Sequence, residues 1–304
     1  MTGTAPDANA TRLRCSDTAR LAGDPLVATA PPAECWLLVE HCGPWGRKAL
    51  TESGVDRATA AALAHWIQTN QARVALVRRP GAGRSSGRPR RWFLVDSRPG
   101  REAVRAGVFA EDPALVDVLA DPAPGTAATE PIYLVCTHGR HDACCAVYGR
   151  PVAAALAERY PQRTWECTHV GGDRFAANLV LLPHGLYYGH VAPQLAVDLV
   201  ERYGRGHLHP ALLRGRSSIA PAVQAAQHHA RLATGDTAID SLAVLSVHQD
   251  DPTTWSVRLA TATGRAVAVT VRSRIVDSGR TLTCADTRPG RYRTFDLLAL
   301  AAPG

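Results

Sequence analysis

The sequence has almost no lysine and no long apolar run. Lys48 is the only lysine among the 34 lysines and arginines of this 304-residue chain, so arginine supplies nearly all of the positive charge behind the net charge of +7. Alanine, glycine and proline are frequent too, as in proteins from GC-rich genomes, and the charge is therefore weak evidence about binding partners. No apolar run approaches the roughly 20 residues that a membrane-spanning helix needs, and we expect no membrane insertion.

Signatures of several other protein classes are also missing. Residues 1–10 are polar and carry no apolar stretch behind a basic start, so we expect no secretory signal and a cytosolic protein without structural disulfides. The chain has no Gly-rich phosphate-binding loop in the required context, no Gly-x-Ser-x-Gly elbow and no His-Glu-x-x-His helix. A glycosidase-like pair of carboxylates is not evident either, and we expect no sugar hydrolysis.

The remaining composition is that of a globular protein. Hydrophobic residues make up 46% of the chain and charged residues 20%, and this length accommodates one large domain or two of ordinary size. Residues 1–31, rich in Ala, Thr, Asp and Pro, form an N-terminal arm with one short helix over 18–22. The arm precedes the first core.

The apolar pattern predicts two halves with the same order of elements. Residues 32–127 form the first half, with strands at 36–39, 74–77 and 92–95 and a helix capped by Asp56. Residues 128–210 form the second half. Its predicted elements are a strand at 132–135, a loop over 136–149, a helix that opens at Pro151, strands at 163–168, 178–182 and 186–191, and a helix over 193–203.

This element order is that of a thioredoxin-like layer. We therefore predict an α/β protein with two tandem thioredoxin-like halves, of which the first is a degenerate copy. Residues 211–304 form a helical connection over 220–232 and a small antiparallel β-meander that ends near Phe295. Its strands alternate apolar and polar residues, so we expect one face in water and the other packed against the second half.

Two segments of the second half carry the densest chemistry. Cys136 ends a predicted strand and Cys145 precedes the helix, so the loop between them can bring both thiolates to one metal ion or cluster. Cys167 and His169 lie on the same side of an extended segment, and Gly171 and Gly172 let the backbone turn close to a bulky inorganic group. Thiolates with imidazole suit Zn²⁺ or an iron–sulfur cluster. The usual zinc spacing of two to four residues between cysteines is absent here.

The two segments resemble the sucrase/ferredoxin-like family, a branch of the thioredoxin-like ferredoxins. The matching patterns are Cys-x-His-Gly-x-x-Asp-x-x-Cys over 136–145 and Cys-Thr-His-x-Gly-Gly-x-Arg-Phe-Ala-x-Asn over 167–178. The resemblance implies a thioredoxin-like ferredoxin fold and a [2Fe–2S] cluster held by two cysteines and two histidines. It assigns Cys136 and Cys145 as cysteine ligands and His169 as the first histidine of a His-x-Gly-Gly-His pattern.

The chain departs from this pattern at the fourth ligand, where Asp173 replaces the second histidine. Either Asp173 binds through oxygen or Cys167 supplies a thiolate, and we favour Cys167 because thiolate is the ordinary iron–sulfur ligand. Around these ligands, His138, Arg140 and Arg174, together with Gly171 and Gly172, are candidate neighbours of the cluster. We assign Cys144 as a spare or structural residue, and Cys15, Cys35 and Cys284 to the core.

These residues predict an electron carrier rather than an enzyme with its own substrate. If His169 is a ligand, its second nitrogen can take a proton on reduction, which would make the potential fall as pH rises. Two alternatives stay open: a thiol–disulfide oxidoreductase, which lacks its usual Cys-x-x-Cys signature, and a structural zinc protein. The expected partner is a redox protein, and the arginine-rich segment 78–91 is a candidate docking site for an acidic one. No nucleic-acid module accompanies that segment, so we do not expect nucleic-acid binding.

Overall fold

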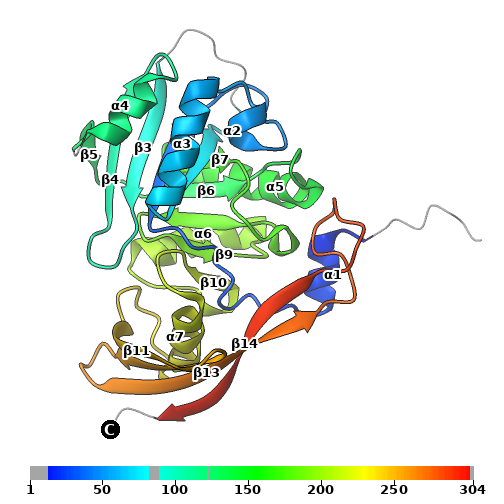
Figure 1. Ribbon diagram of the computed structural model, residues 1–304, viewed down its shortest axis with the longest axis vertical. Helices are drawn as coiled ribbons and strands as arrows, with labels where there is room; N and C mark the ends of the chain where they lie inside the picture. Colours follow the sequence, from blue (N-terminus) through cyan, green and yellow to red (C-terminus); the bar gives the residue numbers. More distant parts are fainter. Residues whose placement is uncertain (1–12, 82–88, 122, 302–304) are drawn as a thin grey trace, which may run out of the picture.

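The computed structural model describes residues 13–81, 89–121 and 123–301. It has a mixed α/β fold with two sheets, one of ten strands in the order β10-β9-β8-β6-β7-β2-β1-β3-β4-β5 and one of four in the order β11-β12-β13-β14. Figure 1 shows the smaller sheet below the larger one. Throughout these residues, every helix is too short or too polar to cross a membrane.

The first half contains the predicted strands and helix together with elements that the pattern did not reveal. Its elements are β1 (Cys35–Glu40), α2 (Ala49–Glu52), α3 (Arg57–Thr69), β2 (Ala72–Arg78), β3 (Arg90–Asp96), β4 (Ala103–Phe109), α4 (Ala114–Ala120) and β5 (Thr126–Ala128). Asp56 caps α3 as predicted, because its carboxylate accepts a hydrogen bond of 2.8 Å from the backbone N–H of Thr59.

The second half follows the same order. Its elements are β6 (Ile132–Cys136), α5 (Ala143–Arg159), β7 (Thr164–Cys167), the 3₁₀ turn η1 (Asp173–Phe175), β8 (Leu179–Leu182), β9 (Leu186–Tyr188) and α6 (Pro193–Gly204). A second 3₁₀ turn, η2 (Pro210–Leu212), leads to β10 (Leu213–Arg216). Although β10 lies beyond the predicted boundary at residue 210, it is an edge strand of the ten-stranded sheet.

Strand pairing is alike in the two halves. In the first, β1 pairs parallel with β2 and antiparallel with β3, and β3 pairs antiparallel with β4. In the second, β6 pairs parallel with β7 and antiparallel with β8, and β8 pairs antiparallel with β9. A short antiparallel contact of β2 with β7, which places Val77 opposite Cys167, joins the halves into one sheet.

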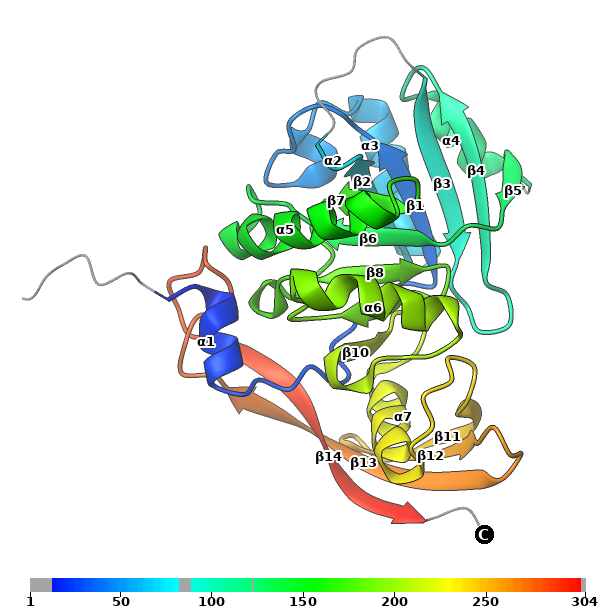
Figure 2. The ribbon, with the colours of Figure 1, turned by 180° about the vertical axis from the view of Figure 1, so that it is seen from behind.

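The joined sheet curls so that its two halves face each other. Trp36 of β1 and Tyr187 of β9 are five strands apart in the sheet order, yet their rings lie 6.0 Å apart. Phe93 and Trp165 also meet across the interior, at 5.4 Å. One apolar core therefore fills the inside of the curl, while α3 and α5 lie on its outside, as Figure 2 shows from behind.

Helix α5 begins eight residues earlier than predicted. The carboxylate of Asp142 accepts a hydrogen bond from the backbone N–H of Cys144 at 2.8 Å and so caps a helix that starts at Ala143. Pro151 lies inside the helix rather than at its first position, so that prediction is wrong. The helix continues past the proline because Val152 and Leu156 are fully buried against the sheet. Cys144 and Cys145 consequently lie in the first helical turn.

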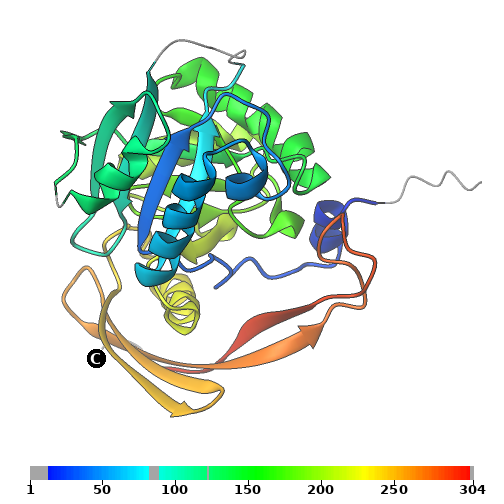
Figure 3. The same cartoon turned by 45° about the horizontal axis from the view of Figure 1, so that its top comes forward.

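The C-terminal part consists of α7 (Pro221–Thr234) and the strands β11 (Ala243–Asp251), β12 (Thr254–Ala260), β13 (Ala266–Asp277) and β14 (Arg291–Ala301). The meander is confirmed, but its packing partner is not the one expected. Val257, Val269 and Val271 bury their side chains against alanines of α7, so the apolar face of the meander packs on this helix. The second half is contacted instead by the far end of the meander, where Tyr292 of β14 lies against Arg174. Figure 3 shows β13 and β14 continuing past α7 as a long arm.

The N-terminal segment lies beside the far end of strands β13 and β14. Its short helix α1 (Cys15–Leu21) starts three residues before the predicted position. Figures 1 and 2 both show α1 next to the connection between β13 and β14. Asp24, which follows α1, pairs with Arg280 in that connection and with Arg174 of η1 at 3.1 Å. The N-terminal arm and the connection between β13 and β14 therefore meet beside η1 of the second half.

Candidate metal centre

The end of β6 and the start of α5 are held in direct backbone contact. A Cβ on Gly149 would lie 2.0 Å from the carbonyl oxygen of Cys136, so only glycine permits this close crossing. Gly149 lies in the second turn of α5, and the crossing there leaves the first turn, with Cys145, beside the end of β6. As a result, Cys145 approaches Cys136 although eight residues separate them in the sequence.

Three of the predicted ligands converge at this point. The sulfur atoms of Cys136 and Cys145 and a ring nitrogen of His169 all lie within 4.8 Å of one another. Cys136 and Cys145 are buried, with exposed fractions of 1% and 0%. Nδ1 of His169 lies 3.8 Å from the Cys145 sulfur. Two soft thiols and an imidazole in one buried corner form a donor set suited to Zn²⁺ or an iron–sulfur cluster.

The loop after β7 turns through two left-handed residues, as its glycines suggested. Gly171 and Gly172 have φ angles of +97° and +84°, a region that residues with a Cβ rarely adopt. A Cβ on Gly172 would also lie 2.5 Å from a guanidinium nitrogen of Arg214. This turn returns the chain toward the cysteines and places Asp173 beside them.

Asp173 is oriented into the centre. Its Oδ1 lies 3.0 Å from Nδ1 of His169 and accepts from the Cys145 thiol at 3.3 Å. His141 approaches its other oxygen at 3.8 Å and stacks on the His169 ring, with centroids 3.8 Å apart. His141, His169 and Asp173 form a second set of donors within 4.8 Å.

Cys167 occupies a different environment. It stands opposite Cys136 in the parallel pairing of β6 and β7, and its side chain is fully buried in the apolar interior. Within the described residues, it belongs to neither set of converging donors. The arrangement therefore brings Asp173, and not Cys167, next to His169.

Electrostatics in the corner follow from these contacts. Contact with the Cys145 thiol, helped by His169, holds the pKa of Cys136 well below its usual value despite burial, and the same contact raises the pKa of Cys145. Burial alone would lower the pKa of His169, but hydrogen bonds to Asp173 and Cys136 raise it to about 9. His169 in turn lowers the pKa of Asp173 against the effect of burial. Negative charge on sulfur is thus favoured at Cys136.

The predicted neighbours of the cluster differ in their placement. His138 supports the centre, because its Nδ1 accepts from the backbone N–H of His169 at 3.1 Å while its Nε2 lies 2.7 Å from the carbonyl oxygen of Gly46. This pattern fixes the Nε2-protonated tautomer and ties the first half to the centre. Arg140 is exposed. Arg174 pairs with Asp24.

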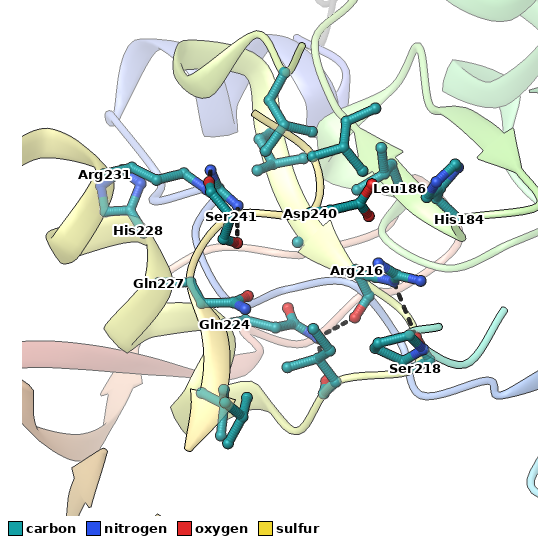
Figure 4. A pocket seen from close by; sticks show the side chains of 18 of the residues that line it. His184, Leu186, Arg216, Ser218, Gln224, Gln227, His228, Arg231, Asp240 and Ser241 are labelled. Carbon is teal, nitrogen blue, oxygen red and sulfur yellow. Dashed lines mark hydrogen bonds between the residues drawn. The ribbon is translucent and has the colours of Figure 1, made fainter. Parts of the chain in front are cut away.

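A large cavity lies elsewhere, between the β9–β10 edge and α7 (Figure 4). It measures about 690 Å³, and its polar lining includes His184, Arg216, Gln224 and Asp240. None of the converging cysteines lines it. The sequence analysis missed this cavity because its walls come from several distant segments that share no motif.

The sequence also did not reveal a second group of cysteines that converge in the structure. Cys15, Cys144 and Cys284, assigned above to the core or left as spare, meet around Asp142. The only hint in the sequence was the number of cysteines, eight, which exceeds the needs of one centre.

Comparison with known proteins gives a family and a limited structural similarity. Residues 26–215 match the family described as Sucrase/ferredoxin-like. A thioredoxin-like [2Fe-2S] ferredoxin from Aquifex aeolicus is 22% identical, and the match covers 29% of this chain and 94% of that chain with a TM-score of 0.26. A cysteine-to-serine variant of the same ferredoxin matches with 22% identity over 28% of this chain and 97% of that chain, at a TM-score of 0.25. No curated protein matches the sequence.

Proposed function

The chain belongs to the sucrase/ferredoxin-like family, and on that premise we propose that it is an electron-transfer protein with a [2Fe–2S] cluster in its second half. The observation that carries the proposal is the convergence of Cys136, Cys145 and His169 within 4.8 Å at the crossing of β6 and α5. When bound, the cluster would supply one-electron chemistry that side chains alone do not offer.

The donors fit such a cluster as two pairs. Cys136 and Cys145 form a thiolate pair, and His169 and Asp173 form the second pair, 3.0 Å apart, from the loop after β7. Each pair would hold one iron. The distances support Asp173 as the fourth ligand over Cys167, which reverses the preference drawn from ligand chemistry alone.

The protein around the donors would restrict access to the centre. Because both thiols are buried, neither has the exposure that a thiol–disulfide oxidoreductase requires of its attacking cysteine. His141 and His138 bracket His169 on its ring face and backbone side. They would fix the ring of a ligand histidine in one orientation.

A single zinc ion is the second candidate for this centre. It is favoured by one observation, namely that the three donor atoms lie within 4.8 Å, a spacing that one tetrahedral ion also satisfies. The colour of the protein separates the two candidates, since zinc has no visible absorption.

The experiment is anaerobic purification followed by visible spectroscopy and iron and sulfide analysis. We expect broad absorbance that bleaches with dithionite and about two iron atoms and two sulfides per chain. Cys136→Ser and Cys145→Ser should lose the iron, whereas Cys35→Ser, outside the centre, should keep it. Colourless wild-type protein from iron-replete cells would end the proposal.

The fourth ligand is tested by two further variants. Asp173→Ala should lose or destabilise the cluster, and Cys167→Ser should retain it. If Cys167→Ser loses the cluster and Asp173→Ala retains it, Cys167 is the fourth ligand. The coupling of reduction to protonation at His169 remains a prediction, and a midpoint potential that does not change between about pH 6 and 9 would remove it.

Two further parts of the proposal concern the relation between the two halves and the arginine-rich segment 78–91. We propose that the halves are related thioredoxin-like copies, since their strands pair alike, and that the first has lost its centre. Docking of an acidic redox partner on segment 78–91 stays a prediction. Arg78 and Arg90 already pair with Glu166 and Asp112 at 2.8 and 2.7 Å, and Arg84 and Arg88 lie outside the described residues.

A further inference from the structure

A second group of metal-binding side chains lies on the other side of the first turn of α5. Cys15 comes from α1, Asp142 and Cys144 from the start of α5, and Cys284 from the connection between β13 and β14. One ligand atom from each lies within 4.8 Å of all the others. The members come from three segments separated by more than 120 residues, so local sequence does not explain their meeting.

The three sulfur atoms form a nearly equilateral triangle. The distances between sulfurs are 3.5 Å for Cys15 and Cys144, 3.4 Å for Cys144 and Cys284, and 3.6 Å for Cys15 and Cys284. A disulfide would need about 2.05 Å between one pair and would leave the third apart. Tetrahedral Zn²⁺ with Zn–S bonds of about 2.3 Å sets its sulfurs about 3.7–3.8 Å apart, so small shifts would admit the ion.

Asp142 completes the set. Its Oδ1 accepts from the backbone N–H of Cys144 at 2.8 Å and its Oδ2 from that of Cys284 at 2.6 Å. These bonds fix the carboxylate beside the sulfurs, with the Cys15 sulfur 3.8 Å from Oδ2. Asp142 is 2% exposed, and within the described residues no cationic side chain pairs with it. The carboxylate already caps α5 through these bonds, and a cation held by the neighbouring thiolates would in addition balance its buried negative charge.

We propose that Cys15, Cys144, Cys284 and Asp142 bind one Zn²⁺ as a closed structural site. Binding would release the thiol protons and leave a buried tetrahedral S₃O site, the kind that contributes to folding rather than to catalysis. The ion would fasten the N-terminal arm and the C-terminal meander to the helix that carries Cys145. Cys15 and Cys284 both lie outside residues 26–215, so this site belongs to segments outside the family match.

The site is distinct from the proposed iron centre. Cys144 and Cys145 are neighbours in sequence, but Cys145 is part of the interior of the curled sheet, whereas Cys144 packs with Cys15 and Ala176. Zinc and iron can therefore be counted separately, and the two proposals can fail independently.

The test is elemental analysis of the full chain, purified without a polyhistidine tag and without added metal from medium that contains zinc and iron. We expect about one zinc per chain in the wild type, and Cys15→Ser and Cys284→Ser should each lower bound zinc about tenfold while the iron content stays unchanged. Cys35→Ser, a matched control outside both groups, should keep both metals. Zinc X-ray absorption of the wild type should show three sulfur neighbours at about 2.3 Å and one oxygen at about 2.0 Å.

Three results would overturn the proposal. One is wild-type protein without zinc, even if its iron is present, which would leave the proposed function intact. The second is zinc that survives in both cysteine variants, or that disappears only in Cys136→Ser, which would move the ion to the first centre. The third is iron lost in Cys284→Ser, which would assign the cluster to this site. The zinc X-ray absorption spectrum is measured on the wild type alone, so it tests the three-sulfur site even if a cysteine variant fails to fold.

Discussion

Replacing Arg214 by lysine keeps the positive charge but removes the planar donor group on which the loop after β7 rests. Arg214 is 1% exposed. Its guanidinium donates to the side-chain oxygen and the carbonyl of Thr29 at 3.0 and 2.6 Å, to the carbonyl of Gly171 at 2.8 Å and to the side chain of Asn178 at 2.7 Å. One side chain thus links the N-terminal arm to the loop that holds His169.

The size of the effect follows from these four hydrogen bonds. A lysine ammonium has three donors on a single atom and cannot reproduce the fork of a guanidinium. We expect one or two buried acceptors to lose their partner at about 1.5–3 kcal/mol each, and so a loss of stability of about 1.5–6 kcal/mol. Since one kcal/mol shifts the melting temperature of a chain of this size by about 2–4 °C, the variant should melt about 10 °C lower.

The assay is differential scanning calorimetry of wild type and Arg214→Lys with matched iron content. Arg202→Lys is the control, because Arg202 pairs with Asp198 on the surface of α6 with about half of its side chain exposed, and such pairs contribute less than about 1 kcal/mol. An Arg214→Lys melting temperature no lower than that of the control would refute the reasoning.

Three further variants test other parts of the structure. Leu134→Ala empties a fully buried position in the central strand β6 and should lower the free energy of unfolding by about 2–5 kcal/mol in urea titrations. Gly172→Ala forces a Cβ to within 2.5 Å of Arg214 at a φ of +84° and should lower stability by at least about 1 kcal/mol, whereas Gly204→Ala, with open space around it, should not. Burial lowers the pKa of His190 from 6.5 to about 4. The unfolded chain therefore binds the extra proton and wild-type stability falls as pH drops from 6.5 to 4; His190→Gln should flatten that fall, and an unchanged pH profile of the urea midpoint would contradict this.

Many strands and helices could be predicted because their apolar residues recur at the spacing of the secondary structure that they form. The strands at 74–77, 92–95 and 132–135 and the helix from Pro193 alternate or repeat their apolar residues in the way that their secondary structure requires. The start of α5 could not, because the helix begins after Asp142 and continues through Pro151, where tertiary burial of Val152 and Leu156 outweighs the local preference of proline for a first helical position. The curl of the sheet depended on contacts between strands that are not neighbours.

The same division applies to the metal centres. The sequence alone determined the candidates Cys136, Cys145 and His169, since they lie in short segments whose spacing and glycines carry the chemistry. Only the tertiary structure decided that Asp173 faces His169 and that Cys15 and Cys284 meet Cys144. Asp173 lies only four residues from His169, and the left-handed turn at Gly171 and Gly172 brings it back to that side chain. For the three cysteines the physical reason is distance along the chain, because side chains more than 120 residues apart become neighbours only through packing of whole elements, which leaves no local motif.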